Sequence, residues 1–263
     1  MAKVKGFLFD VTACKLCGAC WAADKERNKL PILDDNFLKD ELSDKSFLVI
    51  KERLGRGVRF SCMHCLIPTC ASVCPVAALE KTEVGAVIYH DDRCIGCRYC
   101  VIACPFKIPK YEWSKPLPYV RKCDMCYSRI INGQMPACAQ ACPTGALLFG
   151  NREDLIQEAR RRIKQNPNRY VDHIYGEKEV GGTSLMFISD VPLEKLGYPG
   201  NLSENPVPSL TWEALEKIPN VVLLGGAFLI GLWWLTKRRD EVRKAEGLFG
   251  ENKTDSENER SEK

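Results

Sequence analysis

The cysteines constrain this 263-residue chain most, because there are 15 of them and all precede residue 143. They recur at short spacings and form four motifs of four positions each. Fifteen of the sixteen positions are cysteine, and the other is an aspartate. The motifs are Cys14, Cys17, Cys20 and Asp24; Cys62, Cys65, Cys70 and Cys74; Cys94, Cys97, Cys100 and Cys104; and Cys123, Cys126, Cys138 and Cys142. Any fold must therefore be built around four groups of converging thiols.

Three chemistries compete for such thiols. Disulfides suit small secreted domains, but an odd number of cysteines and three thiols at successive three-residue steps make a poor disulfide framework. Structural zinc uses isolated C-x2-C pairs rather than runs of four. The third motif, followed by Pro105, is the bacterial ferredoxin run C-x2-C-x2-C-x3-C-P. The spacing therefore favours iron–sulfur clusters.

In such runs the first three cysteines hold one cluster and the fourth holds its neighbour. Motifs must then work in pairs, and the second and third motifs, closest in sequence, form one pair. The first and fourth motifs form the other. The predicted ligand sets are Cys14, Cys17, Cys20 and Cys142; Cys62, Cys65, Cys70 and Cys104; Cys94, Cys97, Cys100 and Cys74; and Cys123, Cys126, Cys138 and Asp24.

Asp24 has three interpretations. Its carboxylate replaces a thiolate and holds the fourth iron of a 4Fe–4S cluster. Alternatively, that corner is empty and the cluster is 3Fe–4S. In the third interpretation Asp24 is a surface residue, and a small slip in register brings the ligand from elsewhere. The expected cofactors are three 4Fe–4S clusters and a fourth cluster that is 4Fe–4S or 3Fe–4S.

The pattern of strands and helices predicts an α+β fold with two pseudo-symmetric double-cluster ferredoxin-like units and one C-terminal transmembrane helix. Strands are expected at 7–11, in FLVIKERL, in GAVIYHDDRC and in PTGALLFGNRE, with a helix from Asn151 or Asp154 to Lys164. The expected divisions are a four-cluster domain at 1–150, a helix and irregular strap at 151–218, a membrane helix at 219–236 and a charged tail at 237–263.

The membrane helix is predicted from 15 uncharged residues at 221–235, which span about 22 Å as a helix. Residues on either side extend the stretch into the length range of membrane spans. Trp233 and Trp234 stand where interfacial aromatic residues are found. The tail is rich in Glu, Lys, Asn and Ser, a composition typical of disorder.

Further stretches resemble a known family: CRYCVIACPFKIPKYEW, RKCDMC, PACAQACPTGALLFGNRE, HIYGEKEVGGTSLMFISDVP and PGNLSENP. The chain resembles the iron–sulfur β subunit of respiratory formate dehydrogenases and the ferredoxin-type subunit of quinone-reducing nickel–iron hydrogenases. The resemblance implies a large catalytic partner with molybdopterin (molybdenum or tungsten) or nickel–iron. It also implies a membrane partner that is a cytochrome b or quinone-binding subunit. Asp24 departs from the usual all-cysteine pattern.

No nucleophile–base set and no nucleotide loop is visible, so we expect a non-catalytic electron-transfer subunit. The net charge of +4 does not indicate nucleic acid. None of the three histidines lies in the membrane helix, so this chain holds no b haem there, and His64 either tunes a cluster or faces solvent. The alternatives are the electron-input subunit of a polysulfide, thiosulfate or similar reductase, and a self-contained reductase that uses the Asp24 cluster.

Charges flanking the membrane helix predict its orientation. Lys237, Arg238 and Arg239 follow the helix, which places the tail in the cytoplasm and the cluster domain on the periplasmic side of the cell membrane. The N-terminal stretch MAKVKGFLFD has neither twin arginines nor a hydrophobic signal segment. The domain is therefore expected to cross the membrane bound to a partner that carries the export signal. A cytoplasm-facing domain is the competing view.

Overall fold

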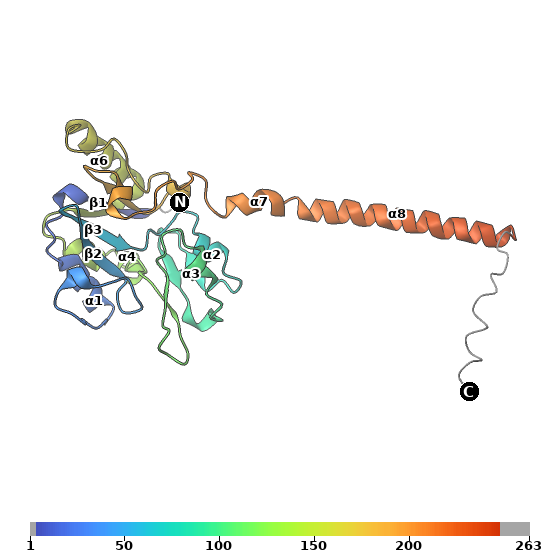
Figure 1. Cartoon of the computed structure of the whole chain (residues 1–263), viewed down its shortest axis with the longest axis horizontal. Coiled ribbons are helices and arrows are strands. Elements are labelled where there is room, and N and C mark those ends of the chain that lie inside the picture. The colour runs from blue at the N-terminus through green and yellow to red at the C-terminus, as the bar shows by residue number, and fades with distance from the viewer. Residues whose placement is uncertain (1–3, 248–263) are drawn as a thin grey trace. The chain divides into compact units, whose positions relative to one another are not determined.

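The computed structural model describes residues 4–247, which form two compact units divided after Leu210 (Figure 1). The first unit, residues 4–210 of the described chain, holds all fifteen cysteines. The second, residues 211–247, is helical.

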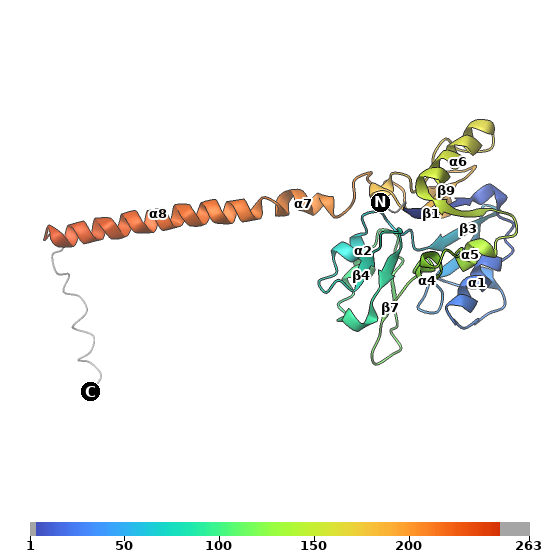
Figure 2. The ribbon, with the colours of Figure 1, turned by 180° about the vertical axis from the view of Figure 1, so that it is seen from behind.

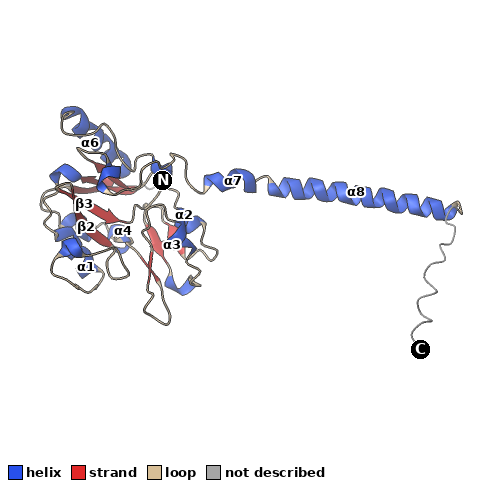
Figure 3. Cartoon of the chain, in the orientation of Figure 1, coloured by secondary structure: helices blue, strands red, loops and turns tan. Residues whose placement is uncertain are grey.

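A three-stranded sheet organises the first unit. Its order is β8 (Leu147–Asn151), β1 (Lys5–Asp10) and β9 (Leu185–Ile188), with β1 antiparallel to β8 and parallel to β9. Figure 3 draws the strands of this unit in red. The strand expected at 7–11 is confirmed, although it begins two residues earlier. It ends at Asp10, where a 3-10 turn begins at Val11.

The two faces of this sheet bury different partners, because successive side chains of a strand point to opposite faces. Leu8 and Met186 of the sheet pack against Leu155 and Ile156 of helix α6 (Arg152–Gln165), which Figure 1 shows over the sheet. Phe7 and the other residues of the opposite face pack into a larger core that includes several cysteines. Burying a side chain such as Leu8 contributes about 1.5–3 kcal/mol. The sheet thus separates the helix from the cysteine loops.

The cysteine loops carry small strands and short helices. The hairpins pair β2 (Leu48–Arg53) with β3 (Arg56–Ser61), β4 (Leu79–Lys81) with β5 (Val87–Tyr89), and β6 (Lys110–Tyr111) with β7 (Val120–Arg121). The helices are α1 (Ala19–Arg27), α2 (Thr69–Ser72), α3 (Tyr99–Ala103), α4 (Tyr127–Ile131) and α5 (Ala137–Gln140). The strands expected in FLVIKERL, GAVIYHDDRC and PTGALLFGNRE are β2, β5 and β8.

One local pattern repeats in all four motifs. The third cysteine is the second residue of a short helix, and the fourth position follows it by four residues. Asp24 occupies that fourth position in α1. Helix α1 packs against α5 and α2 packs against α3, and Figures 1 and 2 show the two pairs on opposite sides of the unit. These contacts join the first motif to the fourth and the second to the third, while pseudo-symmetry of the two halves stays a prediction.

The segment expected to be an irregular strap is more ordered than its sequence indicates. It contains β9, α7 (Ser209–Leu215) and 3-10 turns at Glu179–Gly181 and Leu193–Leu196. Strand β9 pairs with β1 along the central sheet, and its four residues are all buried. A short strand buried on both faces has no alternation of polar and apolar residues, so its sequence does not identify it.

The second unit consists mainly of α8 (Ile218–Ala245), a 28-residue helix about 42 Å long. Within the described residues, the stretch Ser209–Ala245 is the one candidate membrane span, with a mean hydropathy of 1.8 over its most apolar window. The apolar helix expected at 219–236 is present. It continues nine residues into the segment expected to be a disordered tail, and residues 248–263 of that tail lie outside the described residues.

Candidate iron–sulfur cluster sites

Two small cavities are lined by four cysteines each. The first is lined by Cys14, Cys17, Cys20 and Cys142, and apolar side chains such as Phe9 and Ile50 complete its wall. The second is lined by Cys74, Cys94, Cys97 and Cys100, with Leu79 and Val120 among its apolar neighbours. In each cavity the fourth cysteine comes from a different motif. These groupings match two of the predicted sets, and iron ligation by them stays a prediction.

The other two sets are brought together by buried groups that affect one another's ionisation. Burial raises the pKa of Cys65, and the neighbouring Cys62, Cys104 and Cys70 raise it further. Burial also raises the pKa of Cys123, and the carboxylate of Asp24 is the next contributor. Burial also raises the pKa of Cys126, a backbone hydrogen bond from Ala137 opposes that rise, and Cys138 adds to it. These influences are consistent with the other two predicted sets, which stay predictions.

The thiols surround spaces rather than single points. Within residues 4–247, no three His, Cys, Asp or Glu side chains form a group that could hold one metal ion. A zinc ion needs its sulfur ligands about 2.3 Å away, whereas a cluster separates them by the width of its core. Lining by four thiols that come from two different motifs is what a cross-ligated cluster requires.

Backbone conformation shapes each loop around its sulfurs. The residue before the second cysteine has a positive φ in every motif: Leu16 at 53°, His64 at 48°, Gly96 at 71° and Met125 at 63°. This left-handed conformation turns backbone N–H groups toward one point, as in anion-binding loops. The N–H of Gly96 lies 3.4 Å from the sulfur of Cys94, and that of Met125 lies 3.3 Å from Cys123. Only one of the four positions is glycine, so the sequence gives little sign of the shared turn.

Asp24 is buried, with 5% of its surface exposed, so the prediction that it is a surface residue is wrong. One carboxylate oxygen, Oδ1, accepts a hydrogen bond of 3.1 Å from Asn28, and Oδ2 has no partner. Burial raises the pKa of the carboxyl to about 6, while the guanidinium of Arg59 opposes that rise. A buried carboxylate oxygen without a partner is costly, and an iron atom would satisfy it.

Two more buried polar atoms lack a hydrogen-bond partner. Among the described residues, the buried side-chain N and O atoms without a hydrogen-bond partner are Oδ2 of Asp24, Nη1 of Arg59 and Nε2 of His64. His64 is 1% exposed, so the prediction that it faces solvent is wrong. Its Nδ1 accepts the N–H of Val87 at 2.9 Å, which leaves the proton on Nε2. Two donors and one acceptor thus lack partners beside the cysteines, and the sulfide and iron of bound clusters would supply them. The residues fit iron–sulfur clusters.

Comparison with known proteins agrees with this chemistry. Residues 58–152 match the model of a 4Fe-4S dicluster domain. The chain is 35% identical over 276 residues to the hydrogenase-2 operon protein HybA of Escherichia coli O157:H7, covering 89% of this chain and 84% of that protein. This chain belongs to the family of iron–sulfur subunits of hydrogenases and formate dehydrogenases.

Two further relatives support this membership. The chain is 34% identical to the formate dehydrogenase-O iron-sulfur subunit of Escherichia coli K12, over 80% of this chain and 75% of that subunit. A protein of Nitratidesulfovibrio vulgaris is 38% identical over 92% of this chain and 69% of its own length. The resemblance inferred from the motifs is confirmed, and it extends well beyond the cysteine-containing residues.

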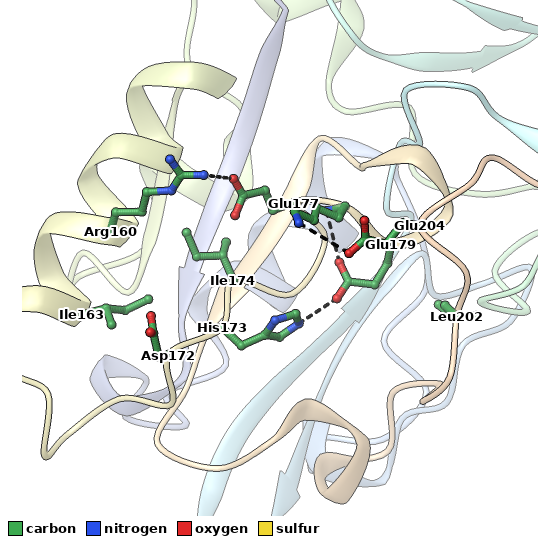
Figure 4. A pocket seen from close by; sticks show the side chains of 10 residues that line it. Arg160, Ile163, Asp172, His173, Ile174, Glu177, Glu179, Leu202 and Glu204 are labelled. Atoms are coloured by element: carbon green, nitrogen blue, oxygen red, sulfur yellow. Dashed lines mark hydrogen bonds and ion pairs between the residues drawn. The ribbon is translucent and has the colours of Figure 1, made fainter.

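Other polar side chains of this iron–sulfur subunit pair with one another. Figure 4 shows a polar cleft between α6 and the segment after it. There His173 pairs with Glu179 at 2.7 Å, and Arg160 pairs with Glu177. His90 pairs with Glu80 at 2.8 Å. No cysteine lines this cleft, and the pair of Arg160 with Glu177 joins the segment to the helix.

Proposed function

We propose that this subunit relays electrons between a catalytic subunit and a quinone or cytochrome b partner in the membrane, through clusters held by the four ligand sets. When bound, the clusters supply one-electron oxidation and reduction. The chain's own residues hold them in a row, shield them from water and set the charge around them. The single observation that carries the proposal is the close succession of the four sets.

That succession is supported by shared burial: one hydrophobic core holds Cys20, Cys138, Cys123 and Cys62, and another holds Cys70 and Cys100. The charges of these cysteines also influence one another. Cys138 of the Asp24 set affects the ionisation of Cys20 in the first set. Cys62 likewise affects the ionisation of Cys123, and Cys100 affects that of Cys70. The order that these relationships support begins with the first set (Cys14, Cys17, Cys20 and Cys142) and the Asp24 set (Cys123, Cys126, Cys138 and Asp24). The Cys62 set (Cys62, Cys65, Cys70 and Cys104) and the Cys94 set (Cys94, Cys97, Cys100 and Cys74) follow. An unbranched row suits transfer between two partners.

The two ends of this row differ in exposure from its middle. Cys17 of the first set is exposed, and Ile95, which lines the cavity of the last set, is 65% exposed. The three cysteines of the Asp24 set are buried. Burial in the middle of the row argues against a self-contained reductase at Asp24, because a substrate would need access to that corner.

The catalytic partner is proposed to be a hydrogenase-type or formate dehydrogenase-type subunit, as the names of the relatives suggest. The family resemblance implies that this partner holds nickel–iron or molybdopterin. The test is to purify the full chain with an affinity tag from its native membranes and identify the chains that accompany it. Formate or hydrogen is then added, and bleaching of the cluster absorption is followed. A large oxidoreductase subunit and bleaching by one donor are expected. A complex that bleaches with neither but is reoxidised by polysulfide or thiosulfate would favour the terminal reductase.

Cluster content is tested by iron and sulfide analysis. Four loaded sets give about sixteen iron atoms per chain, or about fifteen if the Asp24 set holds a 3Fe–4S cluster. A colourless zinc protein would refute the proposal. So would an iron content near eight, which would mean that only two sets are functional.

Helix α8 is proposed as a single-pass anchor, with the cluster domain on the periplasmic side. The basic residues that follow its apolar stretch support this orientation. A cysteine introduced at Lys244 tests it in intact cells with a membrane-impermeant thiol reagent. Protection of that cysteine until the cells are lysed is expected. Labelling from outside would reverse the orientation.

A further inference from the structure

We infer that Arg59 is a fixed counter-charge for the first and Asp24 ligand sets and that it raises the reduction potential of the clusters they hold. The inference rests on the proposed function, since it concerns clusters at those sets. It adds a role for a residue of β3 that lies outside every cysteine motif.

Arg59 is a buried cation without an anionic partner. It is 1% exposed, and no carboxylate of the described residues forms an ion pair with it. Its Nε donates to Ser61 at 3.0 Å, and its guanidinium lies 5.6 Å from the ring centre of Phe7. A buried guanidinium stays protonated, and burying it without a counter-charge is costly. A protein keeps such a charge where an anion compensates it.

The compensating groups are the thiols of two ligand sets. Nη2 of Arg59 lies 3.5 Å from the sulfur of Cys138. Across the β2–β3 hairpin Arg59 pairs with Ile50, which lines the cavity of the first set. Nη1, which has no partner, remains free to donate to a cluster sulfide. Arg59 therefore lies between two neighbouring sets and interacts with both.

The same arrangement recurs along the row. Lys122, also buried, donates to the carbonyl oxygens of Val87 and Cys123 and acts on Cys70. Lys81 donates to the carbonyl oxygens of His64 and Gly85. Neither lysine forms an ion pair with a carboxylate in the described part of the chain. Cations without carboxylate partners thus lie near the Asp24 and Cys62 sets, which are the two inner sets of the row. This is expected if clusters are their counter-ions.

The effect on potential follows from Coulomb's law. Reduction adds a negative charge to a cluster, and a fixed positive charge nearby stabilises the reduced form. Burial reduces the screening by water and salt, so the effect is larger than at the surface. Hydrogen bonds to cluster sulfur act in the same direction. Removing the charge of Arg59 should therefore lower the potentials of both adjacent clusters.

The experiment is a redox titration of the full chain in its complex, followed by EPR, for wild type, Arg59→Gln and Arg59→Lys. Iron content is measured first, so that a wild-type chain without four clusters disproves the proposed function before any variant is compared. In Arg59→Gln, two midpoint potentials are expected to fall while the Cys94 set stays unchanged. Arg59→Lys, which keeps the charge, is expected to lie closer to wild type.

Arg56→Gln is the matched control, because Arg56 lies on the same strand but is paired at the surface with Asp190. It should leave every potential unchanged. Unchanged potentials in a fully loaded Arg59→Gln chain would overturn the inference. If Arg59→Gln fails to load iron, normal loading of Arg59→Lys supports the charge role. Failure of both variants would show that Arg59 acts only by packing.

Discussion

The sulfur of Cys14 lies against the backbone of Gly57: a Cβ atom at position 57 would lie 2.5 Å from that sulfur. Gly57 is in β3, paired with Glu52 of β2, so the hairpin brings a glycine directly against the first ligand set. The strand leaves no room for a larger residue there. A free thiol could rotate away from an added methyl group, but a thiolate bound to iron cannot.

Gly57→Ala should therefore impair the first cluster selectively. The added methyl group displaces Cys14, and we expect a loss of up to about four iron atoms per chain. Iron analysis and EPR of the purified chain measure the loss. Gly150→Ala is the control, because a Cβ atom there meets nothing closer than 3.8 Å. Equal iron content in both variants would contradict the prediction.

His64 supplies a second test of the cluster environment. Burial, followed by the nearby cations Lys122 and Lys81, lowers its pKa well below the usual value, so the imidazole is neutral. Its Nε2–H is then a donor without a partner beside the Cys62 set. His64→Phe removes the donor and should lower the potential of one cluster, since hydrogen bonds to cluster sulfur stabilise the reduced form.

The matched variant is His64→Gln, whose amide can accept from the N–H of Val87 and still donate. It should restore most of the potential lost in His64→Phe. Redox titration with EPR detection distinguishes the two. If both variants titrate as wild type does, Nε2 donates to something other than the cluster.

The two four-cysteine cavities were predictable because cysteine spacing alone favours cross-ligation between motifs, and ligation by the four sets stays a prediction. The strands at 5–10 and 48–53 were predictable from their β-branched and aromatic residues. Strand β9 was not, because four buried residues carry no periodic signal. Arg59 and Gly57 were missed for another reason. Their importance comes from the hairpin that brings them to cysteines far away in sequence, and the stretch LGRGVR carries no motif of its own.

A third prediction concerns stability rather than redox chemistry. Asp10 is 2% exposed at the end of β1, and its carboxylate accepts hydrogen bonds from Thr12, from Arg162 at 3.1 Å and from the hydroxyl of Tyr170 at 2.8 Å. Tyr170→Phe leaves that carboxylate with one partner fewer. We expect a loss of about 1.5–3 kcal/mol in the free energy of unfolding, as is typical of hydrogen bonds to charged groups.

Urea unfolding of the iron-loaded chain measures that loss. Tyr99→Phe is the control, because the Tyr99 side chain is 59% exposed, and its effect should stay within about 0.5 kcal/mol. Equal stability of the two variants would mean that water replaces the lost hydroxyl at Asp10.

The last prediction addresses the iron corner at Asp24. Its carboxyl must lose a proton before it can bind iron, and burial raises its pKa to about 6. A raised carboxyl pKa means that the neutral, non-ligating form gains population as the pH falls toward and below that value. The fourth iron should therefore be held more weakly in acid. We expect the EPR signal of an oxidised three-iron cluster to grow as the pH falls from about 7.5 to about 5.5.

Asp24→Cys is the comparison, because a thiolate holds iron more tightly than a carboxylate does. That variant should keep all four irons of this cluster over the same pH range. Asp24→Asn, which cannot carry the charge, should show the three-iron signal at every pH. Identical spectra in wild type, Asp24→Cys and Asp24→Asn would mean that position 24 never contacts iron. The unpartnered Oδ2 would then need another partner, since a buried carboxylate oxygen without one is too costly to persist.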